Sequence, residues 1–421
     1  MVKVLLDPIT RIEGHLAIEI DVQDGVVRDA KSRGDMFRGF EKILVGRNPV
    51  DANQITQRIC GVCPVSHGLA SSKCLDDAFN IRPNKNGRLL RNLVLGANYL
   101  QSHILHFYHL AALDYVDITA ILQYTGADAK LSAVKEWVKD ELRVKNNRAD
   151  AITAAAPFLP RYEGDFYIKN RSLNIAAIAH YLQALEIRMK AHKMVTAFAG
   201  RAPHLIGLVP GGVTQVPTRE KIREYKKNLN EVEKFVNEVY VKDVIEVAKA
   251  YRNYFGIGKF MDQISYGVFE DNDDGSRFMF ERGVLLNNSV EQLDTSLIKE
   301  QVKYARYSSG SNLHPLQGQT EPQPDKAGAY TWLKAPRYKD RPFEVGPLSR
   351  VAVAYLSGNQ GVKREVDELR KIFNTDITAL FSVLGRHAAR AVEAKLICQR
   401  ARGWLDELDV NGSPRVPYTI P

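Results

Sequence analysis

The chain has 421 residues, 45% of them hydrophobic, so it is long enough to bury a large core and is not a disordered chain. No apolar run reaches the roughly 18 residues that a membrane-spanning helix needs, and the amino terminus lacks the apolar core of a signal peptide. Four cysteines are too few for a disulfide framework. The net charge of +9 is spread thinly, which favours a solvated surface over an acidic partner or a membrane surface, and no nucleic-acid partner is expected.

The amino-terminal part of the chain predicts a β-hairpin, because apolar and polar residues alternate between residues 4 and 30. Asp24-Gly25 is the signal of a type I′ turn. One face of the hairpin carries Leu16, Ile18, Ile20 and Val22. Glu13 lies at the entry to this hairpin, beside Arg11. From the residues alone, Glu13 is most simply a surface carboxylate that pairs with Arg11.

Half of the chain's four cysteines stand in a ten-residue stretch, residues 58–67, with the sequence Arg-Ile-Cys-Gly-Val-Cys-Pro-Val-Ser-His. Two thiolates separated by two residues, Cys60 and Cys63, can converge on one soft metal ion. Gly61 between them lets the backbone bend so that both sulfur atoms point the same way. The stretch is therefore a candidate metal site.

The same cysteine spacing also occurs in zinc sites and in redox dithiols, and the spacing alone leaves all three open. Zinc would need two further soft ligands, whereas Cys74 and Cys398 are isolated and His67 adds only one ligand. A dithiol of the thioredoxin type would lie between a strand and a helix. Here we expect helices on both sides, at residues 52–58 with Asp51 as the cap and at residues 69–79.

The rest of the chain is mainly helical in prediction. Residues 89–116 are apolar nearly all round the helix, so this helix should be buried at the centre. His103, His106 and His109 follow one another on it at helical spacing, but buried histidines are more often satisfied by hydrogen bonds than by a metal. The other expected segments are a loop at 83–87 and a mixed segment at 119–170. Further helices are expected from Ser172 or Asn174 to Gly200, at 218–254, at 362–373 and at 377–408. Residues 256–290 should form a β-rich stretch with a solvated acidic tip at 270–275.

The longer pattern Arg-x-Cys-Gly-x-Cys-x-x-x-His resembles the first cysteine motif of nickel-iron hydrogenase large subunits, closest to their selenium-containing branch. Companion stretches in the family's order support this resemblance, at residues 7–15, 36–41, 103–110 and 334–338. The family also has a second Asp-Pro-Cys-x-x-Cys-x-x-His motif, in which selenocysteine replaces the first cysteine in the selenium branch. These 421 residues do not contain that motif.

The resemblance implies a mainly α, large-subunit hydrogenase fold with central buried helices and a small amino-terminal β element. The implied activity is the reversible oxidation of H2 to protons and electrons. Cys60 would be a terminal nickel ligand and Cys63 a bridging ligand to an iron that carries carbon monoxide and two cyanides. His67 would hydrogen-bond the bridging sulfur, Glu13 would be the proton gate, and Glu41 would bind a magnesium or iron(II) ion.

The resemblance also implies partners. An iron-sulfur small subunit would carry the electrons, since four cysteines are too few for a chain of clusters. A short separate chain with Cys or selenocysteine-x-x-Cys would supply the other two thiolates. We expect residues 1–50 to form the β element that supports the metal site, and residues 51–421 to form an α-rich catalytic domain that is incomplete without this second chain. The protein would be periplasmic or membrane-associated through a partner's signal, with the cytoplasm as the other option.

Two other classes of protein remain open at this point. The quinone-site subunit of respiratory complex I resembles the family but has lost the metal cysteines, so the presence of Cys60 and Cys63 argues against it. The absence of a second cysteine pair keeps it open. A non-catalytic or truncated scaffold subunit is the other alternative.

Overall fold

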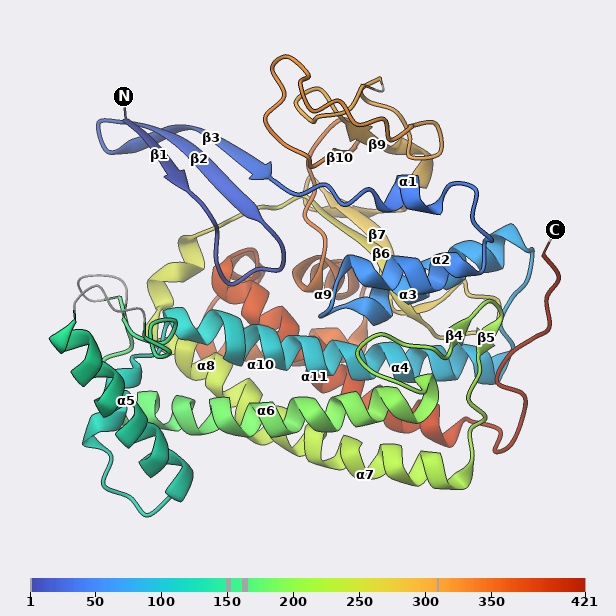
Figure 1. Cartoon of the computed structure of the whole chain (residues 1–421). Coiled ribbons are helices and arrows are strands. Elements are labelled where there is room, and N and C mark those ends of the chain that lie inside the picture. Colours follow the sequence, from blue (N-terminus) through green and yellow to red (C-terminus); the bar gives the residue numbers. More distant parts are fainter. Residues whose placement is uncertain (1, 149–152, 161–165, 309, 421) are drawn as a thin grey trace.

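Long helices form the centre of the protein, whose computed structural model describes residues 2–148, 153–160, 166–308 and 310–420 (Figure 1). Helix α4, Lys85–Ile104, is almost entirely buried and packs against α6, Arg171–Ala199, and α11, Val383–Asp406. Helix α7, Arg219–Phe235, packs against α6. The prediction of a mainly α protein with a buried central helix is confirmed.

The central helix α4 begins earlier than the sequence suggested. The side chain of Asn84 caps it by accepting a hydrogen bond from the Gly87 N–H at 2.8 Å. Gly87 therefore lies in the first helical turn, and its prediction as part of a loop was wrong. A Cβ at Gly87 would lie 3.1 Å from the carbonyl oxygen of Gly211, so close packing explains why glycine stands in a helix here. Beyond Ile104 the helix loosens into a π-helical turn and then a 3-10 turn, Leu105–Leu110 and Ala111–Asp114.

A three-stranded antiparallel sheet stands beside the helices at the amino terminus (Figure 1). Its strands are β1, Val2–Leu6, β2, Leu16–Gln23, and β3, Val26–Gly34. Asp24 and Gly25 have φ angles of 52° and 75°, as the two central residues of a type I′ turn require, so the predicted hairpin is confirmed. The loop between β1 and β2 carries Glu13.

A second antiparallel sheet consists of β6, Gln263–Glu270, β7, Phe278–Leu286, and β8, Ser289–Glu291. Helix α9, Pro347–Leu356, packs on β6 and β7 and was not expected from the sequence.

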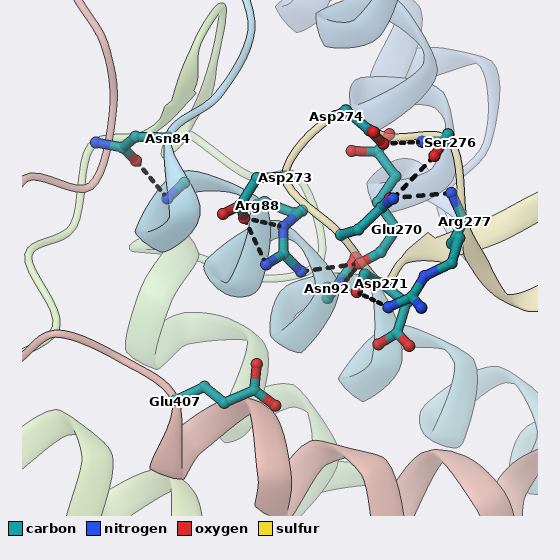
Figure 2. Close-up of polar contacts among 12 residues, drawn as sticks. Asn84, Arg88, Asn92, Glu270, Asp271, Asp273, Asp274, Ser276, Arg277 and Glu407 are labelled. Atoms are coloured by element: carbon teal, nitrogen blue, oxygen red, sulfur yellow. Dashed lines mark hydrogen bonds and ion pairs between the residues drawn. The ribbon is translucent and has the colours of Figure 1, made fainter.

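The acidic tip between β6 and β7 is held against the helices rather than fully solvated. Figure 2 shows Arg88 of α4 between the Asp273 carboxylate, at 2.8 Å, and the Glu270 carbonyl oxygen, at 3.1 Å. Arg400 of α11 binds Asp271 at 2.7 Å. The hairpin was predicted correctly, but its solvation was not, because its arginine partners lie far away in the sequence.

Several helix boundaries also differ from the prediction. Helix α2, Asp51–Thr56, has Val50 and not Asp51 at its N-cap, and α3, Pro64–Ala78, begins at Pro64 rather than at residue 69. Helix α6 is capped by Asn170, but it ends before Gly200 as expected. Helix α7 is capped by Thr218 as expected. The predicted continuous helix to residue 254 is interrupted by a π-helical turn, Val236–Tyr240, before α8, Val241–Ala250.

The remaining elements are short or peripheral. The helices are α1, Phe40–Leu44, α5, Ala129–Asn147, and α10, Gln360–Phe373. The strands are β4, Leu208–Val209, β5, Gly212–Val213, β9, Ile298–Gln301, and β10, Ala335–Tyr338. Single 3-10 turns occupy Gln57–Ile59, Ile118–Gln123, Arg252–Gly256, Thr295–Leu297 and Ile377–Leu380. In the described part of the chain, no helix has the length and apolar character needed to cross a membrane.

Candidate metal centre

Cys60 and Cys63 lie on the short loop between α2 and α3, as predicted. Cys60 has an extended backbone, and Cys63 is the N-cap residue of α3. The Cys60 sulfur accepts hydrogen bonds from the backbone N–H groups of Val62, at 3.3 Å, and Cys63, at 3.2 Å. Both cysteines are free thiols. The amino-terminal end of a helix, where Cys63 lies, favours the thiolate form that binds metals.

The surroundings of Cys63 oppose its ionisation in the absence of a cation. Burial raises the pKa of the Cys63 thiol to about 12, and its hydrogen bond with Cys60 and the negative charges of Cys60 and Glu13 act in the same direction. These effects on the Cys63 pKa outweigh the opposite effect of the amino-terminal end of α3. Two neighbouring thiols of this kind become a thiolate pair when a bound metal ion supplies the positive charge.

Two buried side-chain amides, those of Asn53 and Gln57, hold the cysteine loop in place. The Asn53 amide donates to the Gly68 carbonyl at 2.7 Å and to the Ser72 hydroxyl at 2.6 Å, which ties α2 to α3. The Gln57 amide donates to the Asn53 side-chain oxygen at 2.9 Å, and its own oxygen accepts from the Leu205 N–H at 2.6 Å. The loop that presents the cysteines is therefore fixed to two helices and to the segment before β4.

Arg38 fixes the same loop from the other side. Its guanidinium donates to the carbonyl oxygens of Arg58, at 3.2 Å, and Ile59, at 2.5 Å, and stacks 4.9 Å from the centre of the Phe40 ring. Arg38 belongs to the stretch 36–41, which resembles the family, but the sequence predicted no role for it. The sequence indicated Arg38 only through its place in that stretch. Its hydrogen bonds could not be predicted, because every residue has a backbone carbonyl that can accept them.

His67 lies in the first turn of α3, four residues after Cys63, and is half-buried. Burial lowers the pKa of His67, and the positive charge of Arg38 lowers it further. A neutral imidazole has one N–H donor and one acceptor nitrogen, so His67 can donate to a sulfur without adding positive charge. Its predicted hydrogen bond to the bridging sulfur stays a prediction.

Glu13 is exposed on the β1–β2 loop, and it lies close enough to Cys63 for its charge to act on that thiol. The alternative interpretation, a surface ion pair between Glu13 and Arg11, is wrong for the part of the chain that the structure describes. Arg11 Nε lies 3.4 Å from Asp114 Oδ1 instead, and Arg11 Nη2 donates to the Pro157 carbonyl at 3.3 Å. Glu13 is exposed and has no ion pair among the described residues, while its charge still acts on Cys63.

Glu41 lies in the first turn of α1 and is more than half exposed. Its carboxylate is 3.8 Å from Lys334 Nζ, which also lies 3.3 Å from the Glu300 carboxylate. The proposed magnesium or iron ligand is thus paired with a lysine here, and its metal role stays a prediction.

The three histidines of the central helix are mainly satisfied by protein partners. His103 Nε2 lies 2.9 Å from the Glu393 carboxylate, and His109 Nε2 lies 3.3 Å from the Tyr181 carbonyl. His106 leaves its buried Nδ1 without a partner. The expected hydrogen bonds are confirmed for His103 and His109.

The donor set is incomplete in the described residues. No three or more histidine, cysteine, aspartate or glutamate side chains converge there on a position that could hold a metal ion. Cys60 and Cys63 are the soft donors that nickel and iron prefer, so they fit half of a four-thiolate set.

The sequence matches the family model described as nickel-dependent hydrogenase over residues 38–415. The chain belongs to the nickel-dependent hydrogenase family. Residues 3–33 also match a model described as HoxL-like. Membership of this family disfavours a quinone-site subunit and a scaffold.

Named relatives of this hydrogenase chain are themselves large subunits. The periplasmic [NiFeSe] hydrogenase large subunit of Desulfomicrobium baculatum is 42% identical, over 100% of this chain and 78% of the relative. The quinone-reactive Ni/Fe-hydrogenase large chain of Wolinella succinogenes is 34% identical, over 94% of this chain and 75% of the relative. The hydrogenase-2 large chain of Escherichia coli K12 is 33% identical, over 93% of this chain and 75% of the relative.

Solved structures agree with this assignment. The anaerobically purified [NiFeSe]-hydrogenase of Dm. baculatum superimposes with a TM-score of 0.85 and 41% identity, covering 100% of this chain and 82% of that one. The oxidised Ni-Fe-Se hydrogenase of D. vulgaris Hildenborough gives a TM-score of 0.85 and 39% identity over the same shares. The predicted hydrogenase large-subunit fold and the likeness to the selenium branch are confirmed.

Proposed function

We propose that this chain is the hydrogenase large subunit that holds one half of a nickel-iron centre through Cys60 and Cys63. The observation that carries the proposal is the fixed cysteine loop, with free thiols at both positions and backbone N–H groups directed at the Cys60 sulfur. Cys60 would be the terminal nickel ligand and Cys63 the bridging one. When bound, the centre supplies the chemistry that interconverts H2 with protons and electrons, with carbon monoxide and cyanide on iron.

Glu13 moves protons between the cysteine loop and solvent in this proposal. Its position supports the role, because its charge acts on Cys63 while its side chain stays exposed and no ion pair of Glu13 occurs among the described residues. A carboxylate paired with an arginine would be a poor proton relay, because the positive charge lowers the carboxyl pKa and so disfavours the protonated form. Arg11 is instead directed to Asp114.

Glu41 binds a hard cation, magnesium or iron(II), in the complete enzyme. Carboxylates suit such ions, and in the isolated chain the Glu41 carboxylate has the positive charge of Lys334 at 3.8 Å instead. Metal binding would displace this lysine towards Glu300, which already lies 3.3 Å from it. We also propose that residues 1–50, which carry Glu13 and Glu41, form the supporting unit, and that residues 51–421 form the catalytic one.

Two partners complete the enzyme. An iron-sulfur small subunit takes up the electrons, and a separate short chain with Cys or selenocysteine-x-x-Cys supplies the two thiolates that the described residues do not provide. We propose the periplasm as the location of the enzyme, as named for the Dm. baculatum relative. H2 is the substrate.

Affinity purification of the tagged chain tests the partner proposal. Mass spectrometry should identify an iron-sulfur protein and a short cysteine- or selenocysteine-bearing chain in an active, nickel-containing complex. Cys63→Ser should lose nickel, whereas Cys74→Ser, at an exposed cysteine of α3, should keep it. An active preparation with only these 421 residues and an iron-sulfur subunit would show that no short chain is needed.

A further inference from the structure

A hollow of about 720 Å³ opens between the β6–β7 hairpin and the helices α10 and α11. None of the residues proposed to act on H2 lines it. Four arginines line the hollow: Arg277 and Arg282 from the hairpin, Arg364 from α10, and Arg400 from α11. Its volume lies within the usual range for small-molecule sites.

Two of these arginines already have carboxylate partners. Arg400 is fully engaged, because it binds Asp271 at 2.7 Å and Glu407 at 2.6 Å. Arg364 makes only a long contact, 3.4 Å from Glu365, whose other carboxylate oxygen binds Lys395. The Arg364 side chain is 59% exposed, so its guanidinium can turn to a ligand.

The other two arginines have no carboxylate partner in the described part of the chain. Arg277 Nη2 reaches only the Asp271 carbonyl oxygen, at 3.5 Å, and Figure 2 shows it beside this residue on the hairpin. Arg282 donates through Nε to the Tyr266 carbonyl at 2.8 Å and stacks on the rings of Tyr266 and Phe278. Both have guanidinium N–H groups that make no hydrogen bond to the residues that the structure describes. Neighbouring like charges without counterions repel one another.

The amino-terminal end of α10 adds to this positive potential. Asn359 caps the helix by accepting from the Val362 N–H at 3.1 Å. The N–H groups of Gln360 and Gly361 make no hydrogen bond to the rest of the described chain, and Gly361 lines the hollow. The helix dipole therefore acts with the arginines.

One acidic side chain, Glu281, opposes these charges. Its Oε1 accepts from the Asn359 amide at 2.8 Å, while its buried Oε2 has no partner. Burial raises the pKa of Glu281, so its negative charge is held less firmly than that of an exposed glutamate. Asp271, the other acidic residue of the lining, is neutralised by Arg400.

We propose that this hollow binds a small organic anion that carries two or more phosphate or carboxylate groups. Arg277 and Arg364 hold the anion from opposite walls, the first turn of α10 donates backbone N–H groups, and Arg282 adds a fixed charge on the floor formed by β7. Bidentate binding of phosphate or carboxylate oxygens suits the arginine geometry. The site is separate from the cysteine loop and does not depend on the proposed reaction.

Isothermal titration calorimetry of the purified complex tests the site with two probes, pyrophosphate and citrate. At least one should bind with one site per chain and with an affinity that falls as salt rises. The double variant Arg277→Gln/Arg364→Gln should weaken binding by about tenfold or more, because two charge-assisted contacts are lost. Glu281→Gln should tighten binding, because it removes the opposing charge.

Arg223→Gln is the matched control, since Arg223 is exposed on α7, outside the hollow. The substitution lowers the net charge, as the double variant does. It should leave the affinity unchanged. Absence of binding by both probes, or equal losses in Arg223→Gln, would overturn the proposal. Binding of polyglutamate with neither small anion would also overturn it and would assign the hollow to an acidic protein segment.

Discussion

At the scale of single residues, Glu13 stands between the cysteine loop and solvent without an ion-pair partner among the described residues. Glu13→Gln keeps the shape of the side chain but removes the titrating group. We expect H2 turnover to fall by about 100-fold or more, since proton transfer through a positioned side chain contributes at least this much. Nickel content and melting temperature should stay nearly unchanged.

The control for this prediction is Glu19→Gln, on β2, the strand that follows the Glu13 loop. Among the described residues, the ion pair of the Glu19 carboxylate is with Lys3, at 3.8 Å. Glu19→Gln should leave turnover intact. Equal losses of activity and of thermal stability in Glu13→Gln would show a structural role instead. Hydrogen-deuterium exchange at the active site should also slow in Glu13→Gln, because this exchange needs proton delivery but no distant electron transfer.

Arg38 provides a second test at this scale. Arg38→Lys keeps the charge but loses the fork that reaches both the Arg58 and the Ile59 carbonyl oxygens. Groups that hold metal ligands in place typically affect metal affinity by about tenfold or more, so nickel per chain should fall in metal analysis. Arg47→Lys, which loses only a bond to the nearby Ile43 carbonyl, should retain nickel. Equal nickel contents in the two variants would contradict this role for Arg38.

The sequence predicted the loop that carries the two cysteines better than the contacts around it. The spacing of Cys60 and Cys63 is local, so both could be placed on one loop. The partner of Arg11 is Asp114, which follows the buried helix and is distant in the chain, so the simpler pairing with Glu13 was inferred wrongly. The contacts of Arg38 were missed because they are made to backbone atoms.

At the scale of elements, Gln57 joins the cysteine loop to the segment that leads into β4. Gln57→Leu has a similar shape, but it leaves the buried Leu205 N–H and the Asn53 side-chain oxygen unpaired. Each unpaired buried group costs about 1–3 kcal/mol, so we expect a loss of about 2–4 kcal/mol in the free energy of unfolding. The measurement is the melting temperature of the complex. Gln23→Leu, at the exposed end of β2, should change it little, and equal shifts would argue against the buried bridge.

The residues at which some helices begin could not be predicted from local sequence patterns, because these boundaries depend on the surrounding structure. The prediction began α3 at residue 69, yet Pro64 opens it, because proline suits the first helical position directly after Cys63. Gly87 looked like a loop residue, although it lies in α4, where a Cβ would lie only 3.1 Å from the backbone of another segment. Thr218 and Gly200 were read correctly because their capping interactions are local.

At the scale of the whole molecule, one buried ionic cluster joins three helices. Arg350 of α9 binds the fully buried Glu393 of α11 through Nε, at 2.5 Å, and Nη2, at 2.8 Å, and His103 of α4 lies 2.9 Å from the same carboxylate. Burial would raise the pKa of Glu393, but Arg350 and His103 outweigh it and lower the pKa to about 2. The cluster fixes the packing of α9 and α11 against α4.

Glu393→Gln should destabilise the protein by about 3–5 kcal/mol, because Arg350 then stays buried without a counterion. The folded-state pKa of Glu393 lies below its ordinary value of 4.5, so its contribution is fully present above pH 4.5 and is lost as pH falls towards 2. The gap in melting temperature between wild type and variant should therefore narrow below about pH 4.5. A gap that is constant over this range would contradict the ionic account. Glu246→Gln, at an exposed pair with Lys249, should have little effect at any pH.

Infrared spectroscopy of the purified complex shows whether Cys60 and Cys63 hold a nickel-iron centre. We expect bands of metal-bound carbon monoxide and cyanide in the wild type and in Cys74→Ser. The same bands should be absent, together with nickel, in Cys60→Ser and Cys63→Ser. A wild-type complex that contains zinc alone and shows no such bands, or bands that persist without Cys60 and Cys63, would contradict the account.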